Sequence, residues 1–139
     1  MRIFILDDCE ILRLSISIVL KDEERITSVE TGDSRDDACR RVLQSGCDTL
    51  LVGLRLRNTN ALEIARQLRT AGANICIVAL GFSTDLNDVQ AMYQAGIDSF
   101  VSLSCDNDEL ISGVLSARRK QHTYDFSITA SYDNTLMLP

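Results

Sequence analysis

Apolar residues mark five short runs along this chain, those at 49–54 and 75–80 nearly continuous, and a stretch with helical periodicity follows each run. The runs occupy residues 2–6, 26–30, 49–54, 75–80 and 98–103. A short apolar run of this kind is typical of a strand that is buried on both faces of a parallel sheet. The pattern therefore predicts five strands.

The helical stretches cover residues 10–21, 34–44, 60–72, 85–95 and 106–119, with their capping positions included. Two of them begin with a capping box, in which a polar N-cap residue precedes a glutamate by three positions. Asn60 stands in this relation to Glu63, and Asp106 to Glu109. The spacing thus predicts where the third and fifth helices start.

Two further expectations concern the other helices. The fourth helix is expected to be capped near Ser83 or Thr84. In the first helix, the apolar side that packs inward is expected to comprise Ile11, Leu12, Leu14, Ile18 and Val19.

The alternation of five strands with five helices predicts an α/β fold, a doubly wound parallel sheet with helices on both of its faces. Residues 1–120 are expected to form this one domain. Residues 121–139 carry few charges and show no clear period, with Ser, Thr, Asn and Asp throughout. They are interpreted as a flexible C-terminal tail or linker.

Composition narrows the function classes. The net charge of −6 argues against direct binding of this chain to nucleic acid or to an anionic membrane. No apolar run approaches the roughly 18 residues of a membrane span, and the N-terminus lacks the plan of a signal peptide, so a cytoplasmic protein is expected. The five cysteines include no C-x-x-C pair, and His122 is the single histidine. No zinc site, disulfide framework, cofactor or histidine-based enzyme mechanism is therefore expected.

Three segments carry a resemblance to a known family. Asp7 and Asp8 follow the first run, the stretch DTLLVGLRLRNTNALEIA covers residues 48–65, and AGIDSF covers residues 95–100. In this order and at this spacing, the segments resemble the receiver domain of bacterial response regulators in two-component signal transduction. The likeness extends over residues 1–119 and implies a flavodoxin-like sheet with strand order 2-1-3-4-5.

The resemblance also implies a phosphorylation pocket at the carboxyl ends of the strands, and here the chain departs from the family. Asp7 and Asp8 match the acidic pair of a typical member. The positions of the acceptor aspartate, the hydroxyl residue and the lysine fall on Gly53, Leu80 and Leu103. A shift of one residue would place the last two on Gly81 and Ser102 instead. Three of the four functional positions therefore lack the reactive, hydroxyl or charged side chain that the family has there.

The physical consequence is a pocket that cannot accept a phosphoryl group in the family's way. Phosphoryl transfer needs a nucleophilic oxygen, and glycine has none. Mg²⁺ prefers carboxylate and phosphate oxygens, so Asp7 and Asp8 alone are expected to bind metal weakly if at all. Arg55 and Arg57 make the rim basic, and one hypothesis pairs them with Asp7 or Asp8 in place of the metal.

Simpler interpretations stand beside these. In the first, Asp7 and Asp8 have no function beyond capping a helix and forming a solvated turn. In the second, Gly53 is needed only because the backbone makes a tight turn there. Phe100 matches the family's aromatic switch position, but a plain core residue would have the same character.

Three functions, none of them enzymatic, are compatible with these features; the first is the prediction adopted, and the second is its main alternative. The first is an atypical receiver that signals without phosphorylation, by binding a partner protein or by homodimerising through the fourth helix, fifth strand and fifth helix at residues 85–119. The second is the regulatory part of a transcription regulator, whose DNA-binding domain would lie beyond residue 139. The third is a sensor in which the altered pocket takes a ligand, or in which Cys9 and Cys105 respond to oxidants.

Overall fold

The computed structural model describes residues 1–82 and 85–119, in which strands and helices alternate. The elements are β1 (Arg2–Leu6), α1 (Glu10–Lys21), β2 (Ser28–Gly32), α2 (Ala38–Ser45), β3 (Thr49–Gly53), α3 (Ala61–Thr70), β4 (Cys76–Gly81), α4 (Leu86–Ala95), β5 (Ser99–Ser102) and α5 (Asn107–Arg119). No helix within these residues is both long and apolar enough to span a membrane. The predicted tail, residues 121–139, lies outside the described residues.

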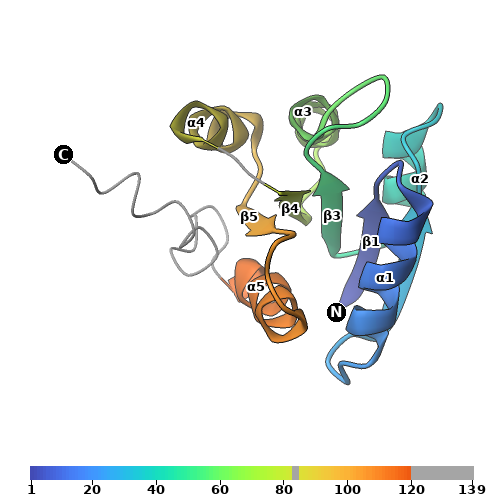
Figure 1. The fold of residues 1–139 in the computed structure, drawn as a ribbon. Coiled ribbons are helices and arrows are strands. Elements are labelled where there is room, and N and C mark those ends of the chain that lie inside the picture. Colours follow the sequence, from blue (N-terminus) through green and yellow to red (C-terminus); the bar gives the residue numbers. More distant parts are fainter. Residues whose placement is uncertain (83–84, 120–139) are drawn as a thin grey trace.

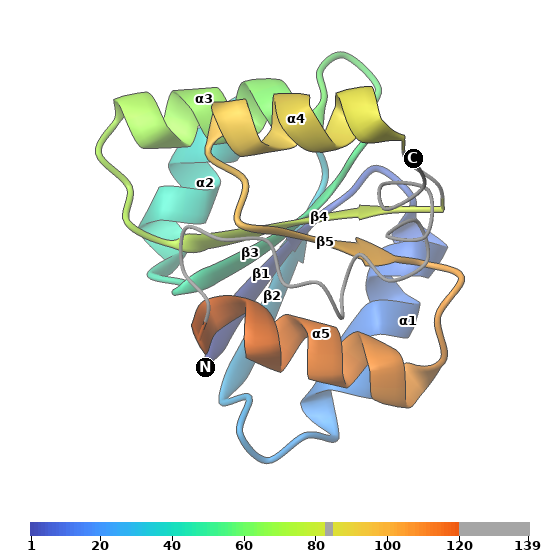
Figure 2. The ribbon, with the colours of Figure 1, turned by 90° about the vertical axis from the view of Figure 1, so that its left-hand side faces the viewer.

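The sheet has the predicted order, β2-β1-β3-β4-β5, and neighbouring strands are parallel throughout. Figures 1 and 2 show that α1 and α5 cover one face, whereas α2, α3 and α4 cover the other. Alternate residues of β1 serve the two cores: Ile3 and Ile5 pack with α1 and α5, and Phe4 and Leu6 with the opposite helices. The predicted doubly wound fold is confirmed.

Both predicted N-cap residues cap their helices, and the capping box at Asp106 has both of its hydrogen bonds. The amide of Glu63 donates to Asn60 Oδ1 at 2.9 Å. The amide of Glu109 donates to Asp106 Oδ1 at 2.8 Å, and Glu109 Oε1 accepts from the Asp106 amide at 3.4 Å. These bonds satisfy amides that a helix start leaves without an intrahelical partner.

The boundaries around β2 and α2 were predicted wrongly. The strand covers Ser28–Gly32, two residues later than expected, and the helix starts at Ala38 instead of residue 34. Ser34 is bonded to Asp8, and Asp37 has the left-handed φ of 65°, so the chain cannot become helical before Ala38. The expected cap of α4 also moves: Asp85 accepts from the Asp88 amide at 2.9 Å.

The predicted inward face of α1 was wrong for three residues. Ile11, Leu14 and Ile18 are 76%, 60% and 64% exposed, whereas Ile16 and Leu20 are buried. Apolar side chains lie on both sides of this helix, so its periodicity alone could not identify the side that packs on the sheet. The result is a stripe of three exposed apolar side chains along α1.

Candidate functional site

The carboxyl ends of the parallel strands meet at one edge of the sheet, which is where ligands bind in open α/β sheets. Asp7 and Asp8 follow β1 at this edge, Gly53 ends β3, and Leu80 lies opposite Gly53 in β4. Leu103 follows β5 directly, and its amide donates to the carbonyl of Gly81 at 2.8 Å. The residues proposed from the sequence as a degenerate pocket therefore lie together at the same edge.

Gly53 leaves room that the carboxylate of Asp7 fills. A Cβ atom at Gly53 would overlap with Oδ2 of Asp7, and it would lie 3.1 Å from Asp7 Cγ and 3.3 Å from Leu56 Cδ2. Gly53 and Asp7 are both buried. In this arrangement, no side chain can extend from Gly53 unless Asp7 moves away.

Asp7 is held in place from several directions. Its Oδ1 accepts from the Cys9 amide at 2.8 Å, and its main-chain carbonyl accepts from Arg13 Nη1 at 2.6 Å. Its own amide donates to the Gly32 carbonyl at 3.1 Å. Burial raises the pKa of Asp7, and the charge of Asp8 adds to this, while the Cys9 bond and Arg13 oppose it without cancelling the increase.

Asp8 joins three loops through its carboxylate. The amide and the hydroxyl of Ser34 each lie 2.8 Å from Oδ1, and the hydroxyl is also 2.8 Å from Oδ2. The Arg57 amide donates to Oδ2 at 2.5 Å. Burial raises the pKa of Asp8, but the bonds from Ser34 and Arg57 and the charge of Arg57 outweigh it, so the net pKa is lowered.

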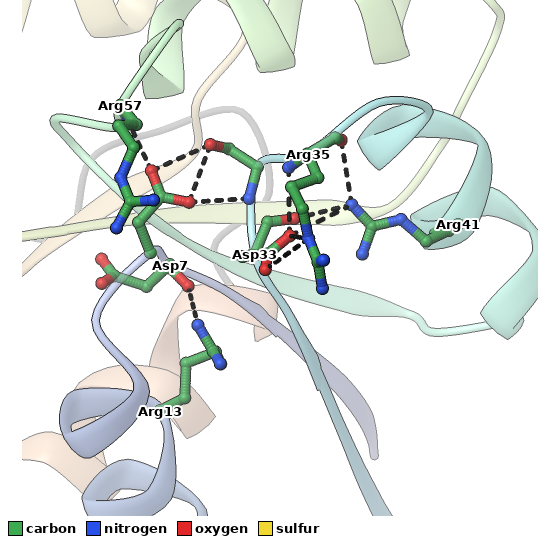
Figure 3. A network of polar contacts seen from close by, with 8 residues as sticks. Asp7, Arg13, Asp33, Arg35, Arg41 and Arg57 are labelled. Carbon is green, nitrogen blue, oxygen red and sulfur yellow. Dashed lines mark hydrogen bonds and ion pairs between the residues drawn. The ribbon is translucent and has the colours of Figure 1, made fainter.

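A further network fixes the loop that carries Ser34, and its members Asp33, Arg35 and Arg41 are labelled in Figure 3. Arg41 Nη2 donates to the carbonyls of Asp33 and Arg35 at 2.7 and 3.0 Å. Arg35 Nε donates to Asp33 Oδ1 at 3.0 Å. The loop between β2 and α2 is thereby fixed on both sides of Ser34.

The hypothesis that the side chain of Arg55 or Arg57 forms an ion pair with Asp7 or Asp8 is wrong. Both side chains are exposed, and no ion pair within residues 1–82 and 85–119 joins either guanidinium to Asp7 or Asp8. Arg57 binds Asp8 through its main-chain amide, and Arg13 binds the carbonyl of Asp7. Both carboxylates thus take hydrogen bonds from main-chain amides at this edge.

The hydrogen-bond donors around Asp7 and Asp8 suit a structural role of these carboxylates better than metal binding. Asp8 accepts protein hydrogen bonds on both oxygens, and Mg²⁺ would have to compete with these donors. In the described part of the chain, no group of three or more His, Cys, Asp or Glu side chains is arranged to hold a metal ion. Cation binding by Asp7 and Asp8 stays a prediction.

Beside Asp7 lies a cavity of about 480 Å³, and its lining is mostly apolar. It is lined by Asp7, Cys9, Ile11, Leu12, Ser15, Leu54, Arg55, Leu80, Gly81, Phe82 and Leu103. The leucines come from the strand ends and from α1, so the cavity lies between this helix and the edge of the sheet. The two leucines that the resemblance placed at polar positions, Leu80 and Leu103, are part of its wall.

The two cysteines proposed as redox sensors differ in their surroundings. Cys9 is exposed and lines the cavity, whereas Cys105 is partly buried against the core. Burial raises the pKa of the Cys105 thiol, and the charges of Glu109 and Asp106 add to the increase. Since the thiolate is the reactive form, oxidation of Cys105 is disfavoured.

Phe100, the proposed switch residue, is 1% exposed and packs in the core on the side of α2, α3 and α4. A Cβ atom at Gly81 would lie 3.3 Å from its ring. Phe100 therefore reaches the same strand end as the site from the opposite face of the sheet. Its function as a switch stays a prediction.

Several residues of the site were not foreseen. Ser34 and Arg13 hold the acidic pair, and Phe82 lines the cavity while being 70% exposed. A signal for Ser34 was available, because it follows β2, whose carboxyl end lies beside that of β1 in the predicted strand order. Nothing in the sequence pattern pointed to Arg13 or Phe82.

The opposite pKa shifts of Asp7 and Asp8 predict opposite effects of two matched substitutions. At neutral pH, Asp8→Asn should lower the free energy of unfolding by about 1–2 kcal/mol, because an amide nitrogen cannot accept from Ser34 and Arg57 as a carboxylate does. Asp7→Asn should raise it, because the burial of a charge is removed while the bond to Cys9 can persist.

The pH dependence separates the two effects. The raised pKa of Asp7 means that the wild type loses stability as pH rises from the ordinary aspartate pKa through the folded value. The lowered pKa of Asp8 means that stability is lost as pH falls below the ordinary value. Urea denaturation of both variants across this range tests the assignment, and effects of the same sign at neutral pH would contradict it.

The sequence is similar to those of known signalling proteins. A family model described as the response regulator receiver domain matches residues 3–115. The response regulator protein VraR of Staphylococcus saprophyticus is 21% identical over 135 residues, which cover 97% of this chain and 65% of that protein. The transcriptional regulatory protein ResD of Bacillus subtilis is 24% identical over 137 residues, covering 98% of this chain and 56% of that protein. The chain thus spans well under the full length of both relatives.

Solved structures agree on the fold. The receiver domain of RcsB from Salmonella enterica, solved in the presence of the phosphomimetic BeF₃⁻, has a TM-score of 0.77 at 15% identity, covering 94% of this chain and 96% of its own. A LuxR-family two-component response regulator from Aurantimonas has a TM-score of 0.85 at 18% identity, covering 99% and 98%.

Proposed function

This chain belongs to the response regulator receiver domain family, and we propose that it acts as an atypical receiver whose signalling does not depend on phosphorylation. The observation that carries the proposal is the contact between Gly53 and Asp7. An acceptor aspartate at the end of β3 would need the volume that the Asp7 carboxylate fills. On this proposal no acceptor stands at the end of β3, and the Asp7 carboxylate fills the space that its side chain would need.

The remaining positions support the same conclusion. Leu80 and Leu103 can neither donate a hydrogen bond to a phosphoryl oxygen nor neutralise its charge. Asp8, which would hold Mg²⁺ in a typical member, is engaged with Ser34 and Arg57. In-line phosphoryl transfer needs a nucleophile, a metal and a cation together. The proposal is supported by a glycine at the nucleophile position, a leucine at the cation position, and an Asp8 carboxylate that already accepts hydrogen bonds from the protein.

We further propose that the chain signals by protein–protein contact, including homodimerisation through α4, β5 and α5. Leu86 and Tyr93 on α4 are 49% and 61% exposed. They are seven residues apart, which places them on the same side of the helix, two turns from each other. Aromatic and aliphatic side chains of this kind are the usual anchors of an interface. The exposed stripe of α1, formed by Ile11, Leu14 and Ile18, is the competing surface.

Light scattering on matched variants tests this surface. Leu86→Ser with Tyr93→Ser should shift a dimeric wild type towards the monomer, whereas Leu14→Ser with Ile18→Ser should leave its mass unchanged. Addition of acetyl phosphate and Mg²⁺ should change neither result. A monomeric wild type, or dissociation by the α1 pair alone, would contradict the proposed dimer, and a change of mass with the phosphodonor would contradict phosphorylation-independent signalling.

A second candidate is supported by the relatives. ResD is named a transcriptional regulatory protein, and a Staphylococcus aureus neighbour of similar fold is described as a DNA-binding response regulator. This chain covers 56% of ResD, so the same domain here would be the regulatory part of a longer regulator. The size of the native protein in its source cells distinguishes the two: a product with a DNA-binding segment after residue 139 supports the regulator, and a product without one discards it.

A further inference from the structure

We propose that the apolar cavity beside Asp7 binds a small organic amine with an apolar body, such as an arylalkylamine. The proposal deepens the function suggested above and rests on it in one respect, since a receiver that takes no phosphoryl group needs another input. It combines two features of the cavity, its mostly apolar wall and Asp7, the one carboxylate among its lining residues.

The size and the wall of the cavity suit an apolar molecule. Its volume of about 480 Å³ lies within the range of small-molecule sites, roughly 300–1,000 Å³. Four of the eleven lining residues are leucines, namely Leu12, Leu54, Leu80 and Leu103, and Leu80 is 1% exposed. Water in such a space finds few hydrogen-bonding partners, so an apolar group can displace it at little cost.

The mouth of the cavity points to the same chemistry. Ile11 and Phe82 both line the cavity and are 76% and 70% exposed. Large apolar side chains that face water at the rim of a cavity gain from being covered. A molecule with an aromatic or aliphatic body would cover both while filling the space behind them.

The carboxylate of Asp7 in the cavity lining selects the head group. Asp7 is 8% exposed, and its Oδ2 lies against Gly53 while Oδ1 is bonded to Cys9. An ammonium group that reaches this carboxylate would form a charge-assisted hydrogen bond in a partly desolvated place. An anionic head group would instead meet Asp7 and the neighbouring Asp8.

The arginines near the cavity do not reverse this preference. Arg13 is already bonded to the main-chain carbonyl of Asp7 at 2.6 Å. Arg55 lines the cavity, but its side chain is exposed to solvent, where its charge is screened. The buried carboxylate is therefore the stronger determinant of which charge the cavity accepts.

Three probes that differ only in their head group test the proposal: 4-phenylbutylamine, 4-phenyl-1-butanol and 4-phenylbutyrate. Each is titrated into the full chain labelled with ¹⁵N, and binding is followed by amide shifts. We expect saturable shifts at Ser15, Leu54 and Leu103, with the amine binding roughly tenfold more tightly than the alcohol and the butyrate binding most weakly. No saturable shift at these amides, or a different order of the probes, would overturn the proposal.

Variants separate the head group from the cavity. Asp7→Asn should remove the advantage of the amine over the alcohol and leave the alcohol unchanged. Ser15→Trp, at an exposed position of α1 that lines the cavity, should abolish binding of all three probes. Ile18→Ser, on the same helix but away from the cavity, is the matched control and should change nothing. Amine preference that survives Asp7→Asn, or binding that survives Ser15→Trp, would place the site elsewhere.

Failure here is distinguishable from failure of the proposed function. A chain that accepts a phosphoryl group but still binds the amine would contradict phosphorylation-independent signalling and leave the cavity assignment standing. A chain that accepts no phosphoryl group and shows no saturable probe binding would contradict the cavity assignment and leave phosphorylation-independent signalling standing.

Discussion

Replacement of Arg69 by leucine should lower the free energy of unfolding by about 3–5 kcal/mol, the range for removing one partner of a buried ion pair. Arg69 Nη2 lies 2.9 Å from Oδ2 of Asp98, whose side chain is 7% exposed. Without the arginine, this buried carboxylate would keep its bond from the Ile77 amide but lose its counter-charge.

The guanidinium also satisfies three main-chain carbonyls. It donates to Ala73 and Ile75 at 2.9 and 2.8 Å, and to Gly96 at 3.0 and 2.8 Å. Buried acceptors that lose their donor cost about 1–3 kcal/mol each. Because these carbonyls precede β4 and follow α4, Arg69 fixes the position of α4 and so of the proposed interface.

Chemical denaturation measures this effect, and Arg66→Leu on the same helix is the matched control. Arg66 is 55% exposed and lies 3.6 Å from a half-exposed Glu63, so its removal should cost less than about 0.5 kcal/mol. A loss of similar size for both arginines would show that the buried network does not stabilise the fold as described.

A second large effect is expected at Gly53. Gly53→Ala should destabilise the wild type by about 1–2 kcal/mol, because the new methyl group overlaps with Asp7 Oδ2 and forces that side chain out of its place. The φ of Gly53 lies outside the left-handed region, so the backbone itself can accept alanine. The cost therefore arises from neighbouring side chains, chiefly from Asp7, with Leu56 Cδ2 as a lesser contact at 3.3 Å.

A double-mutant cycle isolates this contact. In an Asp7→Ala background the space is empty, and Gly53→Ala should stabilise the protein by about 0.5–1 kcal/mol through the lower entropy of the unfolded chain. Urea denaturation of the wild type, both single variants and the double variant gives the coupling energy. The same effect of Gly53→Ala in both backgrounds would contradict the packing of Asp7 against Gly53.

The sequence predicted the sheet well because its signals were local and repeated. Runs such as 49–54 and 75–80, and caps such as Asn60 and Asp106, each specify a structure within a few residues. Strand order came from the family resemblance, and the gathering of Asp7, Gly53, Leu80 and Leu103 at one edge follows from it.

What could not be predicted depends on contacts between distant residues. Asp8 and Ser34 are 26 positions apart, and Asp8 and Arg57 are 49 apart, so no pattern within one element records their bonds. Asp7 fills the space beside Gly53 because its side chain adopts one particular rotamer, and the sequence pattern does not specify rotamers. The exposed stripe of α1 escaped prediction because apolar side chains lie on both sides of that helix.

The most direct measurement is intact-protein mass spectrometry of the full chain after incubation with acetyl phosphate and Mg²⁺, beside a receiver that carries an aspartate at the corresponding strand end. The control should gain one phosphoryl group. This chain is expected to keep its unmodified mass, since Gly53 offers no oxygen and Asp7 and Asp8 are held by hydrogen bonds. A stable phosphoryl adduct mapped to Asp7, Asp8 or any other carboxylate of the chain would contradict the account.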